Sequence, residues 1–153
     1  VCGTIGDAGL GLRIAKGEIE GPRRLLKAYR LPKPLLAQGR SLAPRVSAMA
    51  DVSDGLLIDA SRMAAASGLH VRVMLDAIPL SAEAQGFGTD CAALLAAATA
   101  GDDYALLCAA APDWDLSDIA VPVGEFSEGA GVSLLREGHS VPLPQSLGWM
   151  HRN

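Results

Sequence analysis

The chain has 153 residues, of which 50% are apolar, 20% are charged and 4% are aromatic. A chain of this length buries roughly 68–70% of its unfolded surface on folding, so one domain with a sizeable core needs no disulfide or structural zinc. The 13 Lys and Arg residues against 17 Asp and Glu give a net charge of −4, and they form no run of cations. This pattern argues against a nucleic-acid partner. A membrane span needs about 18 consecutive apolar residues, and no apolar run in this chain is that long, so we also expect no membrane partner.

The three cysteines, Cys2, Cys91 and Cys108, are widely spaced and stand beside small or apolar residues. Their odd number and spacing predict reduced thiols in a cytoplasmic protein, with no zinc motif. The chain begins at Val1 without an initiator Met or the basic region of a signal peptide. We therefore expect it to be a segment of a longer protein.

The first third of the chain predicts three helices. A helix over 7–16 contains Gly9 and Gly11, which would let it pack closely or approach a ligand. The second runs from Pro22, a residue favoured in a first helical turn, to Tyr29. A third short helix ends near residue 42.

The middle of the chain contains the clearest helical pattern. The apolar stretch 46–52 predicts a buried strand, after which Ser53 or Asp54 would cap a helix that ends at Ser67. Asp59 and Arg62 are expected to pair on the solvent side of this helix. Its buried stripe is predicted from apolar residues at helical spacing, which are Leu56, Ala60, Met63 and Ala64.

The remaining elements alternate between strands and helices. We expect a strand over 71–75, a helix over 90–98, and further strands at 104–109, 119–123 and 132–136. The glycines between the last two strands are typical of a hairpin connection, and they are Gly124, Gly129 and Gly131. The fold class is therefore α/β or α+β, a mixed β-sheet covered by helices.

An acidic junction separates the 46–52 strand from the following helix. It carries Asp51, Ser53 and Asp54. Carboxylates suit Mg²⁺, which takes one or two of them and completes its shell with water and phosphate oxygens, and a helix N-terminus attracts phosphate. The alternative is a plain helix cap, which accounts for one of these polar residues but not for three.

Two further features could contribute to a site. Asp102 and Asp103 follow Gly101 and could bind a metal or an amine, although paired Asp residues also form ordinary turns. Trp149, after Gly148, could stack on a flat heterocycle or simply cover the core. No dinucleotide or P-loop glycine motif is present.

Taken together, these stretches resemble the C-terminal half of the thiamine-monophosphate kinase family, within the superfamily of aminoimidazole ribonucleotide synthetase. The glycine-led start and the acidic junction are common to the superfamily. The other segments favour the thiamine-phosphate branch. The matching segments are 3–8, 50–56, 75–81, 101–107 and 148–149.

The resemblance implies ATP-dependent transfer of a phosphoryl group onto thiamine phosphate, which gives thiamine diphosphate, with Mg²⁺ holding the phosphates. Carried over by position, Asp51 and Asp54 would be magnesium ligands and Ser53 would contact ATP. Asp102 would contact the substrate, and Trp149 would stack on its thiamine end. Phosphoryl transfer depends on positioning and charge neutralisation, which agrees with a site rich in carboxylates.

The chain departs from the family pattern near the substrate end. Asp102 stands where the family usually has Glu, Ala100 where it has Gly, Leu35 where it has Arg, and Met150 where an acidic residue often follows the aromatic. These departures leave the identity of the phosphate acceptor open.

The resemblance also implies that residues 1–153 are one C-terminal domain. An N-terminal domain that binds ATP and magnesium and forms a homodimer would be absent, so we expect this chain alone to be inactive. The alternatives are half of another ATP-dependent synthetase of the superfamily, or a non-catalytic interaction module. Mg²⁺-dependent ATP binding would distinguish a kinase half from an interaction module.

Overall fold

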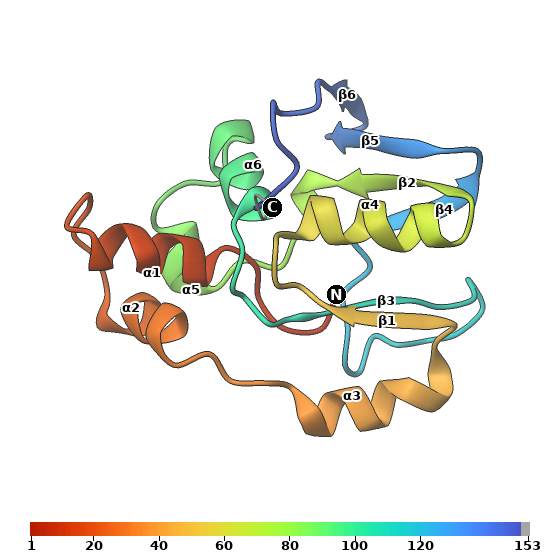
Figure 1. The fold of residues 1–153 in the computed structure, drawn as a ribbon, viewed down its shortest axis with the longest axis horizontal. Helices are drawn as coiled ribbons and strands as arrows, with labels where there is room; N and C mark the ends of the chain where they lie inside the picture. Colours follow the sequence, from red (N-terminus) through yellow and green to blue (C-terminus); the bar gives the residue numbers. More distant parts are fainter. Residues whose placement is uncertain (151–153) are drawn as a thin grey trace.

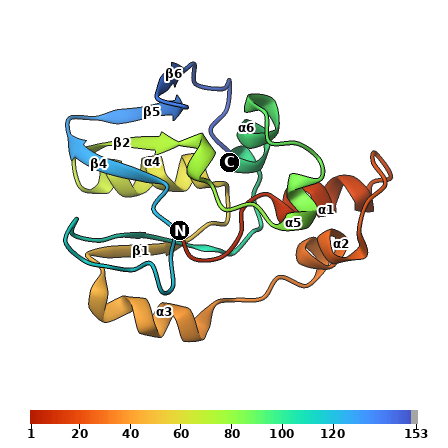
Figure 2. The ribbon, with the colours of Figure 1, turned by 180° about the vertical axis from the view of Figure 1, so that it is seen from behind.

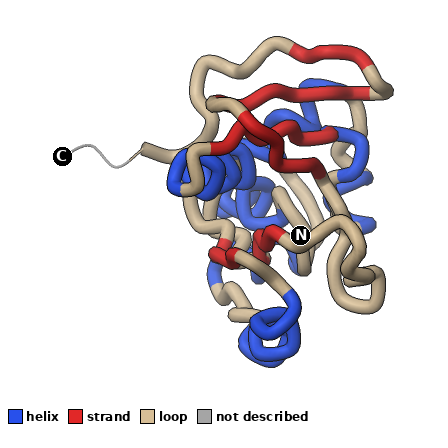
Figure 3. The backbone as a smooth tube through the Cα atoms, turned by 90° about the vertical axis from the view of Figure 1, so that its right-hand side faces the viewer, coloured by secondary structure: helices blue, strands red, loops and turns tan. Residues whose placement is uncertain are grey.

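Two β-sheets form the centre of the structure, which is a computed structural model that describes residues 1–150. In the smaller sheet β1 (Ala48–Asp51) pairs antiparallel with β3 (Leu106–Ala109). The larger sheet has the order β4-β2-β5-β6, and Figure 3 shows the two groups of strands apart from each other. Its strands are β2 (Leu69–Met74), β4 (Gly124–Glu128), β5 (Gly131–Arg136) and β6 (His139–Val141).

Helices surround both sheets, as the sequence predicted for this fold class. In Figure 1, α4 lies along β2, whereas α1, α2 and α5 gather at the other end of the molecule and α3 lies beside β1. Figure 2 shows the reverse side, where β4 is in front of α4. The helices are α1 (Asp7–Ala15), α2 (Arg23–Arg30), α3 (Leu36–Leu42), α4 (Leu56–Ala66), α5 (Ala82–Gln85) and α6 (Cys91–Thr99), with 3₁₀ turns at Ala43–Arg45 and Leu75–Ala77.

The core forms between α4 and the larger sheet. The predicted stripe of α4 is confirmed: Leu56, Ala60 and Ala64 are buried and Met63 packs against the core. Opposite them lie apolar residues from the strands and the segment before β4, including Val71, Val73, Val123 and Leu134. Full burial of one such aliphatic side chain stabilises the fold by about 1.5–3 kcal/mol, so α4 is held firmly and its first turn is a rigid support.

Helix α1 packs closely against α2, which resolves one of the alternatives left open by its glycines. A Cβ atom at Gly11 would collide with the carbonyl oxygen of Leu25, and it would lie 2.8 Å from the Cβ of Tyr29. Gly11 is therefore required by helix packing rather than by a ligand.

Three predictions about the strands are wrong in whole or in part. Residues 46–52 form a strand only over Ala48–Asp51, and most of that strand is exposed because it pairs with β3 on one side. The strand expected at 119–123 begins only at Gly124, after Pro122, which has no amide to donate to a ladder. The connection expected to be a hairpin is not one, because β2 lies between β4 and β5.

The cysteines Cys2, Cys91 and Cys108 are all free thiols. Cys2 is buried, and this burial is the main reason why the pKa of its thiol is raised. None of the helices within residues 1–150 has the length and apolar character needed to cross a bilayer.

Candidate functional site

The acidic junction lies between the end of β1 and the start of α4. Asp51 is the last residue of β1 and is exposed, whereas the following Val52 is fully buried. This alternation fixes the backbone of the junction to the core and turns the Asp51 side chain outward. Within residues 1–150, the Asp51 carboxylate makes no hydrogen bond or ion pair, so it is accessible to a ligand.

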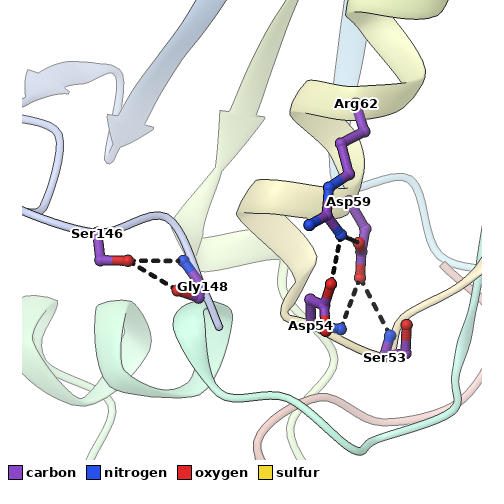
Figure 4. Close-up of polar contacts among 6 residues, drawn as sticks. All are labelled: Ser53, Asp54, Asp59, Arg62, Ser146 and Gly148. Carbon is purple, nitrogen blue, oxygen red and sulfur yellow. Dashed lines mark hydrogen bonds and ion pairs between the residues drawn. The ribbon is translucent and has the colours of Figure 1, made fainter. Parts of the chain in front are cut away.

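The predicted cap of α4 by Ser53 or Asp54 is wrong. Gly55 occupies the cap position, and no side chain caps the helix there. The helix starts later than expected, and a carboxylate from its first turn reaches back instead. Asp59 Oδ2 accepts hydrogen bonds from the amides of Ser53 at 3.0 Å and Asp54 at 3.1 Å (Figure 4). Because both amides already donate to Asp59, they are not available to bind a phosphate.

Arg62 links Asp59 to Asp54. Its Nη1 atom donates to Asp54 Oδ2 at 2.5 Å and to Asp59 Oδ1 at 2.9 Å (Figure 4). The Asp54 hydrogen bond is the main reason why the pKa of Arg62 is raised. The predicted pairing of Asp59 with Arg62 is confirmed, but Asp59 is only 8% exposed and so does not lie on the solvent side.

The loop that contains Asp102 packs directly on this junction. The Asp102 amide donates to the Ser53 carbonyl at 2.8 Å, and the Tyr104 amide donates to the Val52 carbonyl at 2.9 Å. A Cβ atom at Gly101 would lie 2.6 Å from the Ser53 oxygen, so only glycine permits this approach. The backbone of Asp102, whose side chain is exposed, is thereby placed beside Ser53.

The backbone of this loop is unusual. Asp102 has φ 67° and Tyr104 has φ 52°, both in the left-handed region that residues other than glycine seldom adopt. Such conformations persist where the surrounding structure enforces them, and they cluster at functional sites. Here the enforcing contacts are the hydrogen bonds to the junction.

Asp103 has a structural role that the sequence analysis missed. Its carboxylate accepts hydrogen bonds from the amides of Gly6 at 2.6 Å and Ala8 at 3.1 Å, which satisfies donors at the start of α1. Burial raises the pKa of Asp103 to about 7, against the lowering effect of these two hydrogen bonds. Asp103 does not bond its own turn, as an ordinary turn-forming Asp would.

Another acid, Asp7, is buried and supports the same region. Asp7 accepts hydrogen bonds from the hydroxyls of Ser81 at 2.5 Å and Thr4 at 2.9 Å. Asp7 lies in the first turn of α1, where a negative charge is favourable. Its position at a helix start was a signal in the sequence, but its partner Ser81 is distant along the chain.

The C-terminal segment also contacts the junction. The Trp149 amide donates to the Asp54 carbonyl at 2.8 Å. A Cβ atom at Gly148 would collide with that same carbonyl oxygen, so the glycine is needed for the contact. The Trp149 side chain is 66% exposed, which excludes the alternative that it covers the core. A surface hollow of about 530 Å³ is lined by Ser146, Gly148, Trp149 and Met150.

The fold thus gathers the residues that the sequence singled out. Ser53 and Asp54 are joined through the backbone to Asp102 on one side and to Trp149 on the other, and Asp51 is the adjacent end of β1. Within the 150 described residues, no three His, Cys, Asp or Glu side chains converge as a complete metal site.

Two carboxylates nevertheless suit Mg²⁺, which commonly takes one or two from a protein and the rest of its ligands from phosphate and water. Asp51 is exposed, and Asp54 already forms an ion pair with the Arg62 guanidinium. The donor set therefore fits part of a magnesium shell. The remaining ligands would have to come from outside the residues described.

Known proteins are similar to this chain along nearly all of its length. The thiamine-monophosphate kinase of Caulobacter vibrioides is 39% identical over 165 residues, which cover 99% of this chain and 47% of that protein. The chain therefore spans about half the length of this relative.

Solved structures have the same fold. AaThiL, complexed with AMPPCP and TMP, superposes with a TM-score of 0.82 at 26% identity, covering 99% of this chain and 50% of that one. The thiamine-monophosphate kinase of Stenotrophomonas maltophilia has a TM-score of 0.78 at 29% identity, covering 92% and 50%. The family described as AIR synthase related protein, C-terminal domain, matches residues 1–136. The chain thus belongs to the family of AIR synthase related proteins, of which it contains the C-terminal domain.

Proposed function

We propose that this chain is the C-terminal half of an ATP-dependent kinase that phosphorylates thiamine phosphate to thiamine diphosphate. The observation that carries the proposal is the contact between the acidic junction and the aromatic segment. The Trp149 amide donates to the Asp54 carbonyl, so the backbone of the aromatic residue is joined to the backbone of a carboxylate residue suited to magnesium. The similarity to thiamine-monophosphate kinases, one of which is complexed with AMPPCP and TMP, supports the same substrates.

Each site residue has a role that suits its environment. Asp51 and Asp54 would hold Mg²⁺, and the Ser53 hydroxyl would contact ATP. Trp149, largely exposed, would stack on the thiamine ring, which is flat and cationic, through cation–π attraction worth about 0.5–2 kcal/mol. Asp102 is exposed beside Ser53 and would contact the substrate, adding a negative charge that complements the ring.

The chemistry required of the protein is mostly electrostatic. Bound magnesium would neutralise charge on the transferred phosphoryl group. The chain's own residues would orient the two substrates, because in-line transfer needs the attacking and leaving oxygens to be aligned. The rigid first turn of α4 and the loop at Gly101 support this alignment, since both are tied to buried residues of the core.

The other half of such an enzyme would complete the site. We propose that it supplies further magnesium ligands, binds the nucleotide and forms a homodimer, and that the whole protein works in the cytoplasm. The incomplete donor set within residues 1–150 is consistent with this division. This chain alone would then fold without catalysing the reaction.

The test uses the intact gene product that carries this chain. It should convert thiamine phosphate to thiamine diphosphate with ATP and Mg²⁺, and chromatography of the product should show no conversion when Mg²⁺ is chelated. Unphosphorylated thiamine serves as the acceptor control. Mg²⁺-dependent ATP binding without thiamine diphosphate would favour another synthetase of the superfamily. No Mg²⁺-dependent ATP binding would favour an interaction module.

A further inference from the structure

Arg62 stands beside the proposed metal carboxylate without belonging to the roles assigned above. It lies in the second turn of α4, and its side chain is 52% exposed while the Asp54 side chain is 14% exposed. Its Nη1 atom donates to Asp54 Oδ2 at 2.5 Å. A monovalent side-chain cation therefore occupies the position where a carboxylate would offer an oxygen to a metal.

Both hydrogen bonds that hold the guanidinium come from its Nη1 atom. Asp59 Oδ1 accepts from the same Nη1 atom at 2.9 Å, while Asp59 Oδ2 is bound to the amides of Ser53 and Asp54. Asp59 thus fixes the direction in which Arg62 points. In the part of the chain that the structure describes, the Nη2 and Nε donors of Arg62 make no hydrogen bond. Arginine has a planar fork that suits phosphate oxygens, and here most of that fork is available.

We propose that Arg62 is an exchangeable counter-ion of Asp54 that transfers to a phosphate oxygen when the metal–nucleotide complex binds. This inference rests on the proposed function. Without ligand, Arg62 neutralises Asp54. When a metal takes Asp54, Arg62 is repelled by the metal and attracted by the phosphates that accompany it. Asp59 acts as the pivot, because its contact with Arg62 does not involve the exchanged oxygen.

The exchange predicts effects of opposite sign for two ligands. A bare divalent cation brings no phosphate, so Arg62 only competes with it. Arg62→Gln should therefore tighten binding of Mn²⁺ alone by about two- to fivefold, the range expected for an exposed charge pair. The same variant should weaken binding of Mg²⁺ with a non-hydrolysable ATP analogue by about tenfold, because a charged hydrogen bond to phosphate is lost.

The experiment measures both affinities in the intact gene product, by electron paramagnetic resonance for Mn²⁺ and by calorimetry for the nucleotide. Arg62→Lys keeps the charge but not the fork, so it should leave Mn²⁺ affinity unchanged and weaken nucleotide binding less than Arg62→Gln does. This second variant decides the matter if Arg62→Gln does not fold. The matched control is Arg72→Gln on β2, which removes an arginine of similar exposure that is paired with Glu125 at 2.6 Å. It should change neither affinity.

Two results would support the exchange: opposite changes in the two affinities for Arg62→Gln, or weaker nucleotide binding with unchanged Mn²⁺ affinity for Arg62→Lys. Changes in the same direction, or no change in either, would overturn it while the proposed function stands, provided that the wild-type protein binds both ligands. If the wild-type protein binds neither Mn²⁺ nor the metal–nucleotide complex, the proposed function is wrong and the exchange falls with it.

Discussion

The chain has two acidic motifs, the junction at 51–55 and the loop at 101–104. They contain similar pairs of carboxylates, but different donors hydrogen-bond to them. Each contains one exposed carboxylate, Asp51 or Asp102, and one that the protein holds, Asp54 or Asp103. Asp103 accepts from two backbone amides, Gly6 and Ala8. The hydrogen bond at Asp54 Oδ2 comes instead from the side chain of Arg62.

This difference decides what each held carboxylate can do. Backbone amides at a helix start cannot leave without disturbing the helix, so Asp103 is committed to structure. A half-exposed arginine can turn to another anion, so the contact at Asp54 can be exchanged. The motif suited to ligand binding is therefore not the one whose acid has the raised pKa. Strong perturbation of Asp103 marks a structural anchor rather than a ligand site.

The largest effect is expected for Asp51→Asn, which tests the exposed member of the junction. Loss of a metal carboxylate should lower kcat in the intact gene product by roughly 100- to 1,000-fold. The melting temperature should change little, since Asp51 is exposed and its side chain makes no hydrogen bond or ion pair within residues 1–150. A variant that is destabilised yet active would show that Asp51 is a structural residue.

Asp103→Ala should have the largest effect on stability. It leaves the amides of Gly6 and Ala8 without an acceptor inside the protein, which should lower the free energy of unfolding by about 2–4 kcal/mol at pH 6. Asp102→Asn is the control, since Asn tolerates the left-handed conformation and the side chain is exposed. Urea denaturation of both variants measures the difference, and equal losses would contradict the division between anchor and ligand.

The pH dependence of stability tests the same anchor. Burial raises the pKa of Asp103 from 3.8 to about 7, so between these values the folded chain binds more protons than the unfolded chain. The contribution of Asp103 is complete below pH 4 and is lost as the pH rises towards and through 7, by about 2–3 kcal/mol between pH 5 and 8. Asp103→Asn cannot titrate and should show a flatter profile in urea denaturation. An equally steep profile in this variant would assign the effect to another group.

The helices and strands could be predicted from the sequence where their apolar residues recur at regular spacing. Helix α4 and strand β2 bury the residues expected, because periodic burial leaves a periodic pattern. The order of strands was not predictable in this way. The glycines between β4 and β5 mark a local turn, but only the packed sheet determines that β2 lies between the two strands.

Site residues that are adjacent in the sequence could be predicted, whereas contacts between distant residues could not. Asp51, Ser53 and Asp54 stand together in the sequence, so a local motif was enough to select them. The donors that bind Asp103 lie 97 and 95 residues away along the chain, and no local pattern records such a contact. Asp59 was paired correctly with Arg62 at i+3, but its hold on the Ser53 and Asp54 amides depends on where α4 begins.

Trp149 offers the smallest and most selective test, because it separates the substrate side of the site from the metal side. Its side chain is 66% exposed, so Trp149→Ala removes an aromatic face without opening a cavity in the core. The KM for thiamine phosphate should rise about 3- to 30-fold, the loss expected for one stacking and cation–π contact, while the KM for ATP changes less than about twofold. Trp114→Ala is the matched control, since Trp114 is 47% exposed and lies in the segment between β3 and β4. Steady-state kinetics would contradict a substrate role if both Michaelis constants rose together. They would also contradict it if the Trp114 variant behaved like the Trp149 variant, because an effect shared by two exposed tryptophans is not specific to the hollow beside Asp54.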